Sequence, residues 1–303
     1  MSDREVRIYE VGPRDGLQNE EAPIPTEAKL RYIELLANAG LREIEATSFV
    51  SPKAIPQLAD ADELMARLDR QPGVRYPVLV PNARGLERAE AAGADAVCVF
   101  TAASEPFTRA NIGMTIAESL EAFRPVIEGA QAHGWWSRGY VSTAFGCPYQ
   151  GQVGEAAVVA VAQQLLQLGV DELSIGDTIG VAGPADVRRV VRALDVAGIG
   201  PDRLAMHFHD TRGTALSNVV AALELGIRCF DASTGGTGGC PYAPGAAGNL
   251  ATEDLVYLLD REGLSHGVEL DALLEAARHV SQTLGRPLAT KVGRAGGWHP
   301  AVP

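Results

Sequence analysis

The chain has 303 residues, and 26 Lys and Arg against 38 Asp and Glu give it a formal net charge of −12. A hydrophobic content of 46% excludes a wholly disordered chain, and the apolar runs fall short of the ~20 residues that span a bilayer. The acidic balance argues against a nucleic-acid partner. Because the first residues lack a secretion-signal pattern and the four cysteines lack zinc-ribbon spacing, we expect a cytoplasmic protein with reduced thiols and no membrane contact.

One phrase repeats along the chain: an amphipathic stretch, then a glycine, then a short β-rich run. It occurs at 38–46, 91–100, 167–175 and 224–232, and more loosely at 133–141. Glycine adopts the left-handed conformation that ends many helices, so each phrase predicts a helix followed by a strand. The predicted helices include Thr26–Ala39, Ala156–Leu168 and Leu216–Leu225. Eight strands are predicted to start near Val6, Glu43, Arg75, Ala96, Ser137, Asp171, Leu204 and Arg228.

The predicted strands are evenly spaced, roughly 30 residues apart, which suits one βα unit per step. Eight such units favour a closed (β/α)8 TIM barrel. A doubly wound open sheet is the alternative, but it normally has fewer strands, and the turn after the first strand reads GPRDG instead of the dinucleotide-binding GxGxxG. We expect a single α/β domain over residues 1–303, with the barrel at about 6–268 and a C-terminal extra helix and tail at 269–303.

Polar side chains gather at the predicted C-terminal ends of the strands, where TIM barrels carry their active sites. A barrel that needed only stability would not require such residues at several strand ends. They are Arg14, Asp15, Glu45, Ser48, Asn82, Ser174, Asp177, Thr178, His207, His209 and Asp210.

The sharpest of these signals is the H-x-H pair in the sequence MHFHD. Side chains two residues apart on a strand point to the same side, so His207 and His209 can reach one ion. Asp15 can add a carboxylate, because strands one and seven both flank strand eight in a closed barrel. Two imidazoles with a carboxylate suit a divalent metal. The alternative is that both histidines only bond their neighbours, but the shared barrel end favours the metal.

The loop after the last strand, residues 234–249, is rich in glycine. It is either a phosphate cradle or a lid that closes over substrate, and it lacks the GK[ST] ending of a P-loop. Cys240 in this loop is a proton carrier once enclosed or an incidental thiol. Arg14 either binds an anionic oxygen or pairs with Glu45, and Asp177 is either an acid–base group or a helix cap.

Several segments resemble hydroxymethylglutaryl-CoA lyases, members of the DRE-TIM metallolyase superfamily. The resemblance runs from about Val6 to Val292 and is most specific around 239–258. The isopropylmalate synthases and ketoacid aldolases of the superfamily share H-x-H but not GGCPYA. The segments are VGPRDGLQNE, IEATSFVSPK, PNARGLERA, RGYVSTAFGCPYQG, SIGDTIGV, HFHDT and GGCPYAPGAAGNLATEDLVYLL.

The resemblance implies a (β/α)8 lyase that cleaves 3-hydroxy-3-methylglutaryl-CoA to acetyl-CoA and acetoacetate in a retro-Claisen reaction. It implies a homodimer, a role in leucine degradation, and Mg²⁺ or Mn²⁺ held by Asp15, His207, His209 and Asn249. Arg14 would stabilise an enolate and Glu45 would orient Arg14. Protons would pass through Cys240, Asp177 and His207. The substrate would be bound by Arg14, Ser48, Tyr140, Ser174 and Thr178.

The sequence also departs from the family pattern. Glu21 stands where family members usually have Lys, RANIGMTI at 109–116 replaces KKNINCSI, and Thr234 and Thr237 replace apolar residues. The reaction residues are intact, but the acyl group stays open, and a longer 3-hydroxy-3-alkylglutaryl-CoA is an alternative substrate. A metal-dependent aldolase or acyl-transferring synthase of the same superfamily, and a non-catalytic barrel, are the remaining alternatives.

Overall fold

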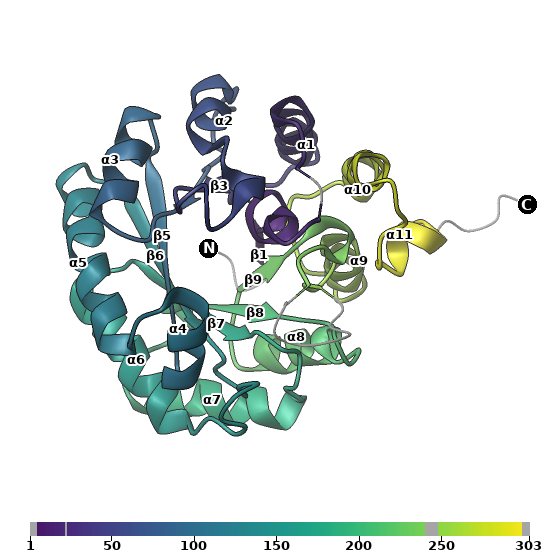
Figure 1. Ribbon diagram of the computed structural model, residues 1–303. Coiled ribbons are helices and arrows are strands. Elements are labelled where there is room, and N and C mark those ends of the chain that lie inside the picture. Colours follow the sequence, from purple (N-terminus) through teal and green to yellow (C-terminus); the bar gives the residue numbers. More distant parts are fainter. Residues whose placement is uncertain (1–4, 22, 240–247, 299–303) are drawn as a thin grey trace, which may run out of the picture.

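The computed structural model describes residues 5–21, 23–239 and 248–298. Its parallel strands form one sheet in the order β2-β1-β9-β8-β7-β6-β5-β4-β3, with the helices arranged around the outside (Figure 1). The strands are β1 (Arg7–Glu10), β2 (Glu43–Ile44), β3 (Thr47–Ser48), β4 (Val78–Leu79), β5 (Ala96–Ala102), β6 (Trp136–Ser142), β7 (Glu172–Asp177), β8 (Leu204–Phe208) and β9 (Cys229–Ala232).

The two ends of this strand order are β2 and β3, which are consecutive in the chain and close the barrel. Between them, the backbone N–H of Glu45 donates to Glu10 O at 2.8 Å, and that of Ala46 donates to Pro77 O at 2.9 Å. One predicted strand is therefore split into two short ones, each bonded to a different neighbour. The predicted (β/α)8 barrel is confirmed, with the second of its eight positions divided between β2 and β3.

Helices follow the strands as predicted, with differences at single positions. Gly169 ends α6 in the left-handed conformation, φ 102°, as the repeated phrase predicts. The third strand starts at Val78, because Arg75 makes only an isolated bridge to Glu43. The helices are α1 (Thr26–Asn38), α2 (Ala61–Arg67), α3 (Ala83–Ala91), α4 (Glu105–Ile112), α5 (Ile116–Ala132), α6 (Glu155–Leu168), α7 (Pro184–Val196), α8 (Ala215–Glu224), α9 (Thr252–Arg261), α10 (Leu270–Leu284) and α11 (Val292–Ala295).

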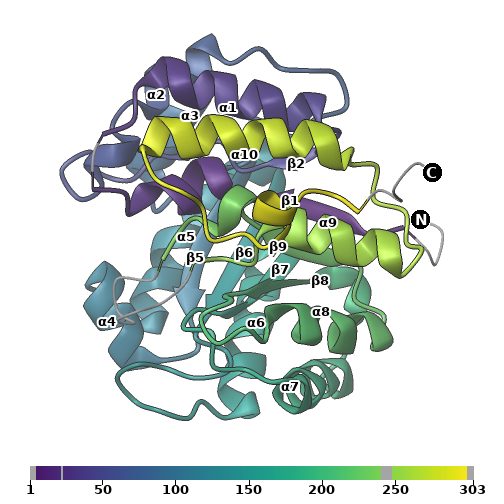
Figure 2. The ribbon, with the colours of Figure 1, turned by 90° about the vertical axis from the view of Figure 1, so that its right-hand side faces the viewer.

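The C-terminal segment adds a helix outside the barrel. Helix α10 packs along α1 (Figure 2), and its apolar side buries Leu273, Ala276 and Val280. The tail that was expected beyond it contains the short α11. The described residues also contain the short helical turns η1 (Gly12–Gly16), η2 (Pro56–Leu58), η3 (Pro201–Arg203) and η4 (Thr234–Gly236).

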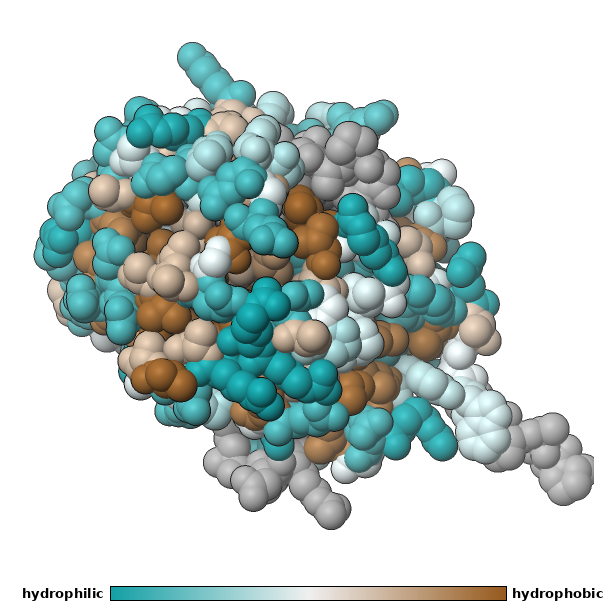
Figure 3. Space-filling view, turned by 90° about the horizontal axis from the view of Figure 1, so that it is seen from below, coloured by the Kyte–Doolittle hydropathy of each residue, from teal (hydrophilic) through white to brown (hydrophobic). Residues whose placement is uncertain are grey.

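The main apolar core lies between the sheet and the helices, and a smaller cluster around Tyr9, Cys98 and Tyr140 fills the barrel interior. The interior also holds charge: the Arg138 guanidinium is fully buried, 3.9 Å from the centroid of the Tyr9 ring. On the face in Figure 3, apolar side chains are interspersed with hydrophilic ones. No helix within the described ranges is long and apolar enough to cross a bilayer.

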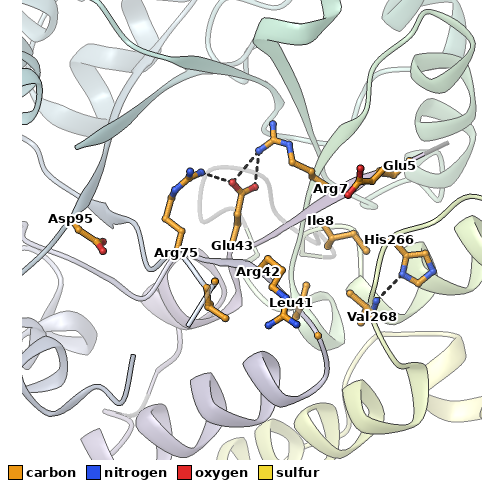
Figure 4. A pocket seen from close by; sticks show the side chains of 14 residues that line it. Glu5, Arg7, Ile8, Leu41, Arg42, Glu43, Arg75, Asp95, His266 and Val268 are labelled. Carbon is orange, nitrogen blue, oxygen red and sulfur yellow. Dashed lines mark hydrogen bonds and ion pairs between the residues drawn. The ribbon is translucent and has the colours of Figure 1, made fainter. Parts of the chain in front are cut away.

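At the amino-terminal end of the barrel, opposite the predicted site, lies a cavity of about 510 Å³. Glu43 binds both Arg7, at 2.8 Å, and Arg75, at 2.6 Å, in its wall (Figure 4). Arg7 also pairs with Glu172 on β7. These ion pairs balance the charges at this end, and unpaired buried charges would destabilise the barrel.

Candidate active site

The turn η1, which follows β1, carries Arg14 and Asp15 to the C-terminal end of the barrel. Its backbone folds back so that the N–H of Asp15 donates to Val11 O at 2.8 Å. Arg14 Nε donates to Glu45 Oε1 at 2.8 Å, and Tyr140 Oη donates to Glu45 Oε2 at 2.5 Å. Glu45 is fully buried and Arg14 is 7% exposed. The buried carboxylate of Glu45 therefore holds the guanidinium of Arg14 in place, and the predicted pair of these two residues is formed.

Asp15, His207 and His209 meet at the barrel mouth. Each offers one ligand atom, and these atoms lie within 4.8 Å of one another. The two histidine Nε2 atoms are 3.2 Å apart. Asn249 bridges to His209 through the backbone and donates Nδ2–H to Asp15 Oδ2 at 2.7 Å. All four residues that the resemblance assigns to the metal are thus brought together.

The donor atoms at this cluster fit a divalent cation. Asn249 Oδ1 and His209 Nδ1 are buried without a hydrogen-bond partner in the described part of the chain. Burial, assisted by the charge of His207, lowers the pKa of His209 to about 3, so its imidazole is neutral and able to bind a metal. Burial opposes the charge of Asp15, but Arg14 and both histidines outweigh it and lower its pKa. Carboxylate and amide oxygens with neutral imidazoles suit Mg²⁺ or Mn²⁺.

Two carboxylates that sequence reasoning missed support the cluster. Asp231 Oδ2 lies 3.1 Å from His207 Nδ1. Burial opposes its charge, but Arg138 outweighs this and lowers the pKa of Asp231. Glu10 accepts the backbone N–H groups of Gly12, at 3.0 Å, and Thr234, at 2.8 Å, and so joins η1 to η4. The available signal was an acidic residue within a short β-strand, since Glu10 ends RIYE and Asp231 lies inside CFDA.

Glycine is required where the last loop passes Asp15. Gly238 has φ 94°, and a Cβ there would lie 2.5 Å from Asn249 Nδ2 and 2.9 Å from the backbone oxygen of Asp15. The loop backbone at Gly238 therefore packs directly against Asp15 and Asn249. Residues 240–247, and with them Cys240, lie outside the described residues.

Several other predicted site residues make structural contacts. The carboxylate of Asp177 accepts the backbone N–H of Val181 at 2.9 Å and of Ala182 at 3.0 Å, and burial raises its pKa. Ser48 Oγ donates to Leu79 O at 3.2 Å. The remaining contacts are Ser174 with Asp231, Thr178 with the Thr143 N–H, Asn82 with the Gly85 N–H, and Asp210 with the Ala215 N–H and Lys291.

Comparison with known proteins gives close matches over almost the whole chain. The chain matches the model of the HMGL-like family over residues 5–280. It is 50% identical over 292 residues to the mitochondrial hydroxymethylglutaryl-CoA lyase of Mus musculus, covering 96% of this chain and 90% of that protein. It superposes on the HMG-CoA lyase of Bacillus subtilis with a TM-score of 0.94 at 48% identity, covering 96% of this chain and 98% of that one. An HMG-CoA lyase from Acinetobacter baumannii, in complex with coenzyme A and 3-methylmalate, gives a TM-score of 0.94 at 40% identity, covering 100% and 99% of the two chains.

Proposed function

The chain belongs to the HMGL-like family, and we propose that it is a carbon–carbon lyase that cleaves 3-hydroxy-3-methylglutaryl-CoA to acetyl-CoA and acetoacetate. The observation that carries the proposal is the meeting of Asp15, His207 and His209 beside Arg14 at the barrel mouth. The same activity is supported by the 50% sequence identity to a hydroxymethylglutaryl-CoA lyase across 96% of the chain.

Asp15, His207, His209 and Asn249 are the residues that would hold Mg²⁺ or Mn²⁺. When bound, the cation supplies Lewis-acid chemistry that polarises substrate oxygens and makes the tertiary hydroxyl more acidic. The fit rests on the acceptor Oδ1 of Asn249, which has no hydrogen-bond partner among the described residues, and on the neutral imidazole of His209.

Arg14 is placed to stabilise the negative charge that develops in the reaction. Loss of the hydroxyl proton and cleavage of the adjacent C–C bond leave a ketone in acetoacetate and an enolate of acetyl-CoA. A permanently charged guanidinium, held by Glu45 and requiring no reorganisation, can stabilise the enolate oxygen. Tyr140 holds the other Glu45 oxygen and thereby orients the pair.

Two protons must move, one from the substrate hydroxyl and one to the enolate carbon. We propose His207, Cys240 and Asp177 for these steps. His207 lies in the cluster itself. Asp177 also accepts two backbone N–H groups, which hold its carboxylate in place.

The acyl pocket is proposed to be lined by Ser48, Ser174, Thr178, Tyr140 and Arg14.

A CoA ester as substrate is supported by the complex of the Acinetobacter baumannii relative with coenzyme A. A substrate panel tests the proposal. It compares two CoA esters, 3-hydroxy-3-methylglutaryl-CoA and a longer 3-alkyl homologue, with a ketoacid that an aldolase would cleave. We expect acetyl-CoA and acetoacetate in equal amounts, identified by mass spectrometry. Turnover of the ketoacid alone would contradict the lyase.

We further propose one domain, a homodimer and a cytoplasmic location. Among the described residues, Cys98, Cys147 and Cys229 are thiols without a disulfide partner, which suits a reducing compartment. Light scattering on the purified protein measures the oligomeric state, and a mass near twice 31.9 kDa is expected.

A further inference from the structure

A buried carboxylate lies directly behind the imidazole of His207. Asp231 on β9 and His207 on β8 are register partners in a parallel pair of strands, so their side chains leave the sheet side by side on one face. Asp231 Oδ2 lies 3.1 Å from His207 Nδ1. The contact is on the ring nitrogen opposite the one that faces His209.

Asp231 is itself held rigidly. Arg138 Nη2 donates to its Oδ1 at 2.6 Å, and Ser174 Oγ donates to its Oδ2 at 2.8 Å. Arg138 is fully buried and lies 3.1 Å from a second acid, Glu172. A carboxylate paired with arginine only accepts hydrogen bonds, so the proton of the contact with His207 is carried by His207 Nδ1.

This arrangement distinguishes the two histidines of the cluster. With the proton on Nδ1, His207 presents a lone pair at Nε2, 3.2 Å from Nε2 of His209. His209 then donates that hydrogen bond from its own Nε2, while its buried Nδ1 has no partner within the described ranges. The tautomer of His207 is fixed by a carboxylate, whereas that of His209 depends only on its contact with His207.

We infer that Asp231, anchored by Arg138 and Ser174, is a positioning residue that fixes the Nδ1–H tautomer of His207 and aims its Nε2 lone pair at the divalent cation. His209 changes tautomer when the cation binds. The inference rests on the proposed metal centre. Mutation of a residue that hydrogen-bonds a metal ligand in this way typically weakens metal binding by about 10–100-fold.

A matched control lies at the other end of the row of buried ion pairs that begins with Asp231 and Arg138. The ion pairs continue from Glu172 to Arg7 and from Arg7 to Glu43, which lines the amino-terminal cavity (Figure 4). Glu43 is buried and paired with arginine, as Asp231 is, but it does not contact His207. Glu43→Gln therefore removes a buried charge of the same kind without touching the histidine.

Long-range ¹H–¹⁵N NMR on metal-free protein labelled with ¹⁵N-histidine reports the tautomer directly. The signals of His207 are assigned by their absence from the spectrum of His207→Gln. We expect Nδ1–H at His207 in the wild type and in Glu43→Gln. In Asp231→Asn the amide N–H faces Nδ1, and the tautomer reverses to Nε2–H. We expect Mn²⁺ to bind Asp231→Asn about 10–100-fold more weakly than wild type, measured from the EPR signal of free Mn²⁺.

An Nε2–H signal at His207 in the wild type would overturn the inference, and so would unchanged Mn²⁺ affinity in Asp231→Asn. The wild-type tautomer decides the question even where that variant fails to fold. Ser174→Ala is then the second variant, and it is expected to weaken Mn²⁺ binding roughly fivefold, the effect of one hydrogen bond. A wild type that binds no Mn²⁺ but carries the Nδ1–H tautomer, reversed in Asp231→Asn, would contradict the metal centre and support the role of Asp231.

Discussion

The guanidinium of Arg14 is held in one orientation by two carboxylates. Glu45 binds it from inside the barrel, and Asp15 lies 2.8 Å from its Nη1. Because Asp15 also lies with His207 and His209, the guanidinium and the proposed metal would share one carboxylate. With the proposed metal bound, two positive charges would lie close to the position where the enolate oxygen forms.

Arg14→Ala is expected to lower kcat about 10²–10³-fold, the effect of removing one preorganised donor from a developing oxyanion. Arg14→Lys keeps the charge but loses the fork that binds Glu45, so it is expected to recover only part of the rate. Arg67→Ala, on the exposed side of α2, is the matched control. Steady-state kinetics with 3-hydroxy-3-methylglutaryl-CoA measure the effect, and near-normal kcat in Arg14→Ala would remove the electrostatic role.

Gly238→Ala is expected to displace Asn249 or Asp15, because its Cβ would lie 2.5 Å from Asn249 Nδ2 at φ 94°. Gly213 has a similar conformation, φ 71°, but a Cβ there meets nothing within 4 Å. Gly213→Ala therefore carries the backbone strain without the collision. We expect weaker Mn²⁺ binding and lower kcat in Gly238→Ala only. Equal losses in both variants would show that strain alone is responsible.

Two elements of the site are joined by buried acidic side chains. Glu10 on β1 binds η1 and η4, and Glu253 on α9 accepts the N–H of Gly235 in η4 at 2.9 Å. The two threonines that depart from the family pattern take part in the same region: Thr234 donates to Glu10 at 3.0 Å, and Thr237 bonds Ser233 at 2.6 Å. The side chains at both departures therefore form hydrogen bonds at the base of the loop.

Burial raises the pKa of Glu253 to about 8, so the folded protein keeps a proton that the unfolded chain loses near pH 4.5. The contribution of Glu253 to the free energy of unfolding has its full value below pH 4.5 and decreases as the pH rises toward 8. One pKa unit corresponds to ~1.4 kcal/mol, so the decline amounts to a few kcal/mol. Urea unfolding at several pH values measures it. Glu253→Gln is expected to flatten the profile in this window, and an unchanged slope would contradict the assignment.

The sequence predicted the elements well wherever a glycine ends a helix before a strand, as Gly169 does. The split between β2 and β3 could not be predicted, because Glu45 and Ala46 bond two different neighbouring strands. The cluster of His207 with Asp15 was anticipated from strand ends alone. Asp231 was missed because its role depends on the register of β9 against β8, which sequence spacing does not specify.

The whole barrel is organised around charges as well as apolar packing. Arg138 fills its centre, paired with Asp231 toward the catalytic end and with Glu172 toward the other end. Removal of one member of a buried pair destabilises by about 3–5 kcal/mol because the other charge is left uncompensated. Arg138→Met is therefore expected to lower the free energy of unfolding by that amount, whereas Arg124→Met, at an exposed side chain of α5, is expected to change it little. Urea unfolding distinguishes the two.

A cation that binds only the folded barrel stabilises the molecule as a whole. Mn²⁺ at about 100 times its Kd is expected to raise the free energy of unfolding by ~2.7 kcal/mol. His209→Ala, which removes one ligand of the cluster, is expected to lose this increment at the same Mn²⁺ concentration. Equal stabilisation of both proteins would place the ion elsewhere on the molecule.

The most direct test of the cation at the barrel mouth is cleavage of 3-hydroxy-3-methylglutaryl-CoA by protein freed of metal with a chelator. We expect no formation of acetyl-CoA in the metal-free protein, and recovery when Mg²⁺ or Mn²⁺ is added to the wild type but not to His209→Ala. Full turnover by the metal-free protein would contradict the assignment of Asp15, His207, His209 and Asn249.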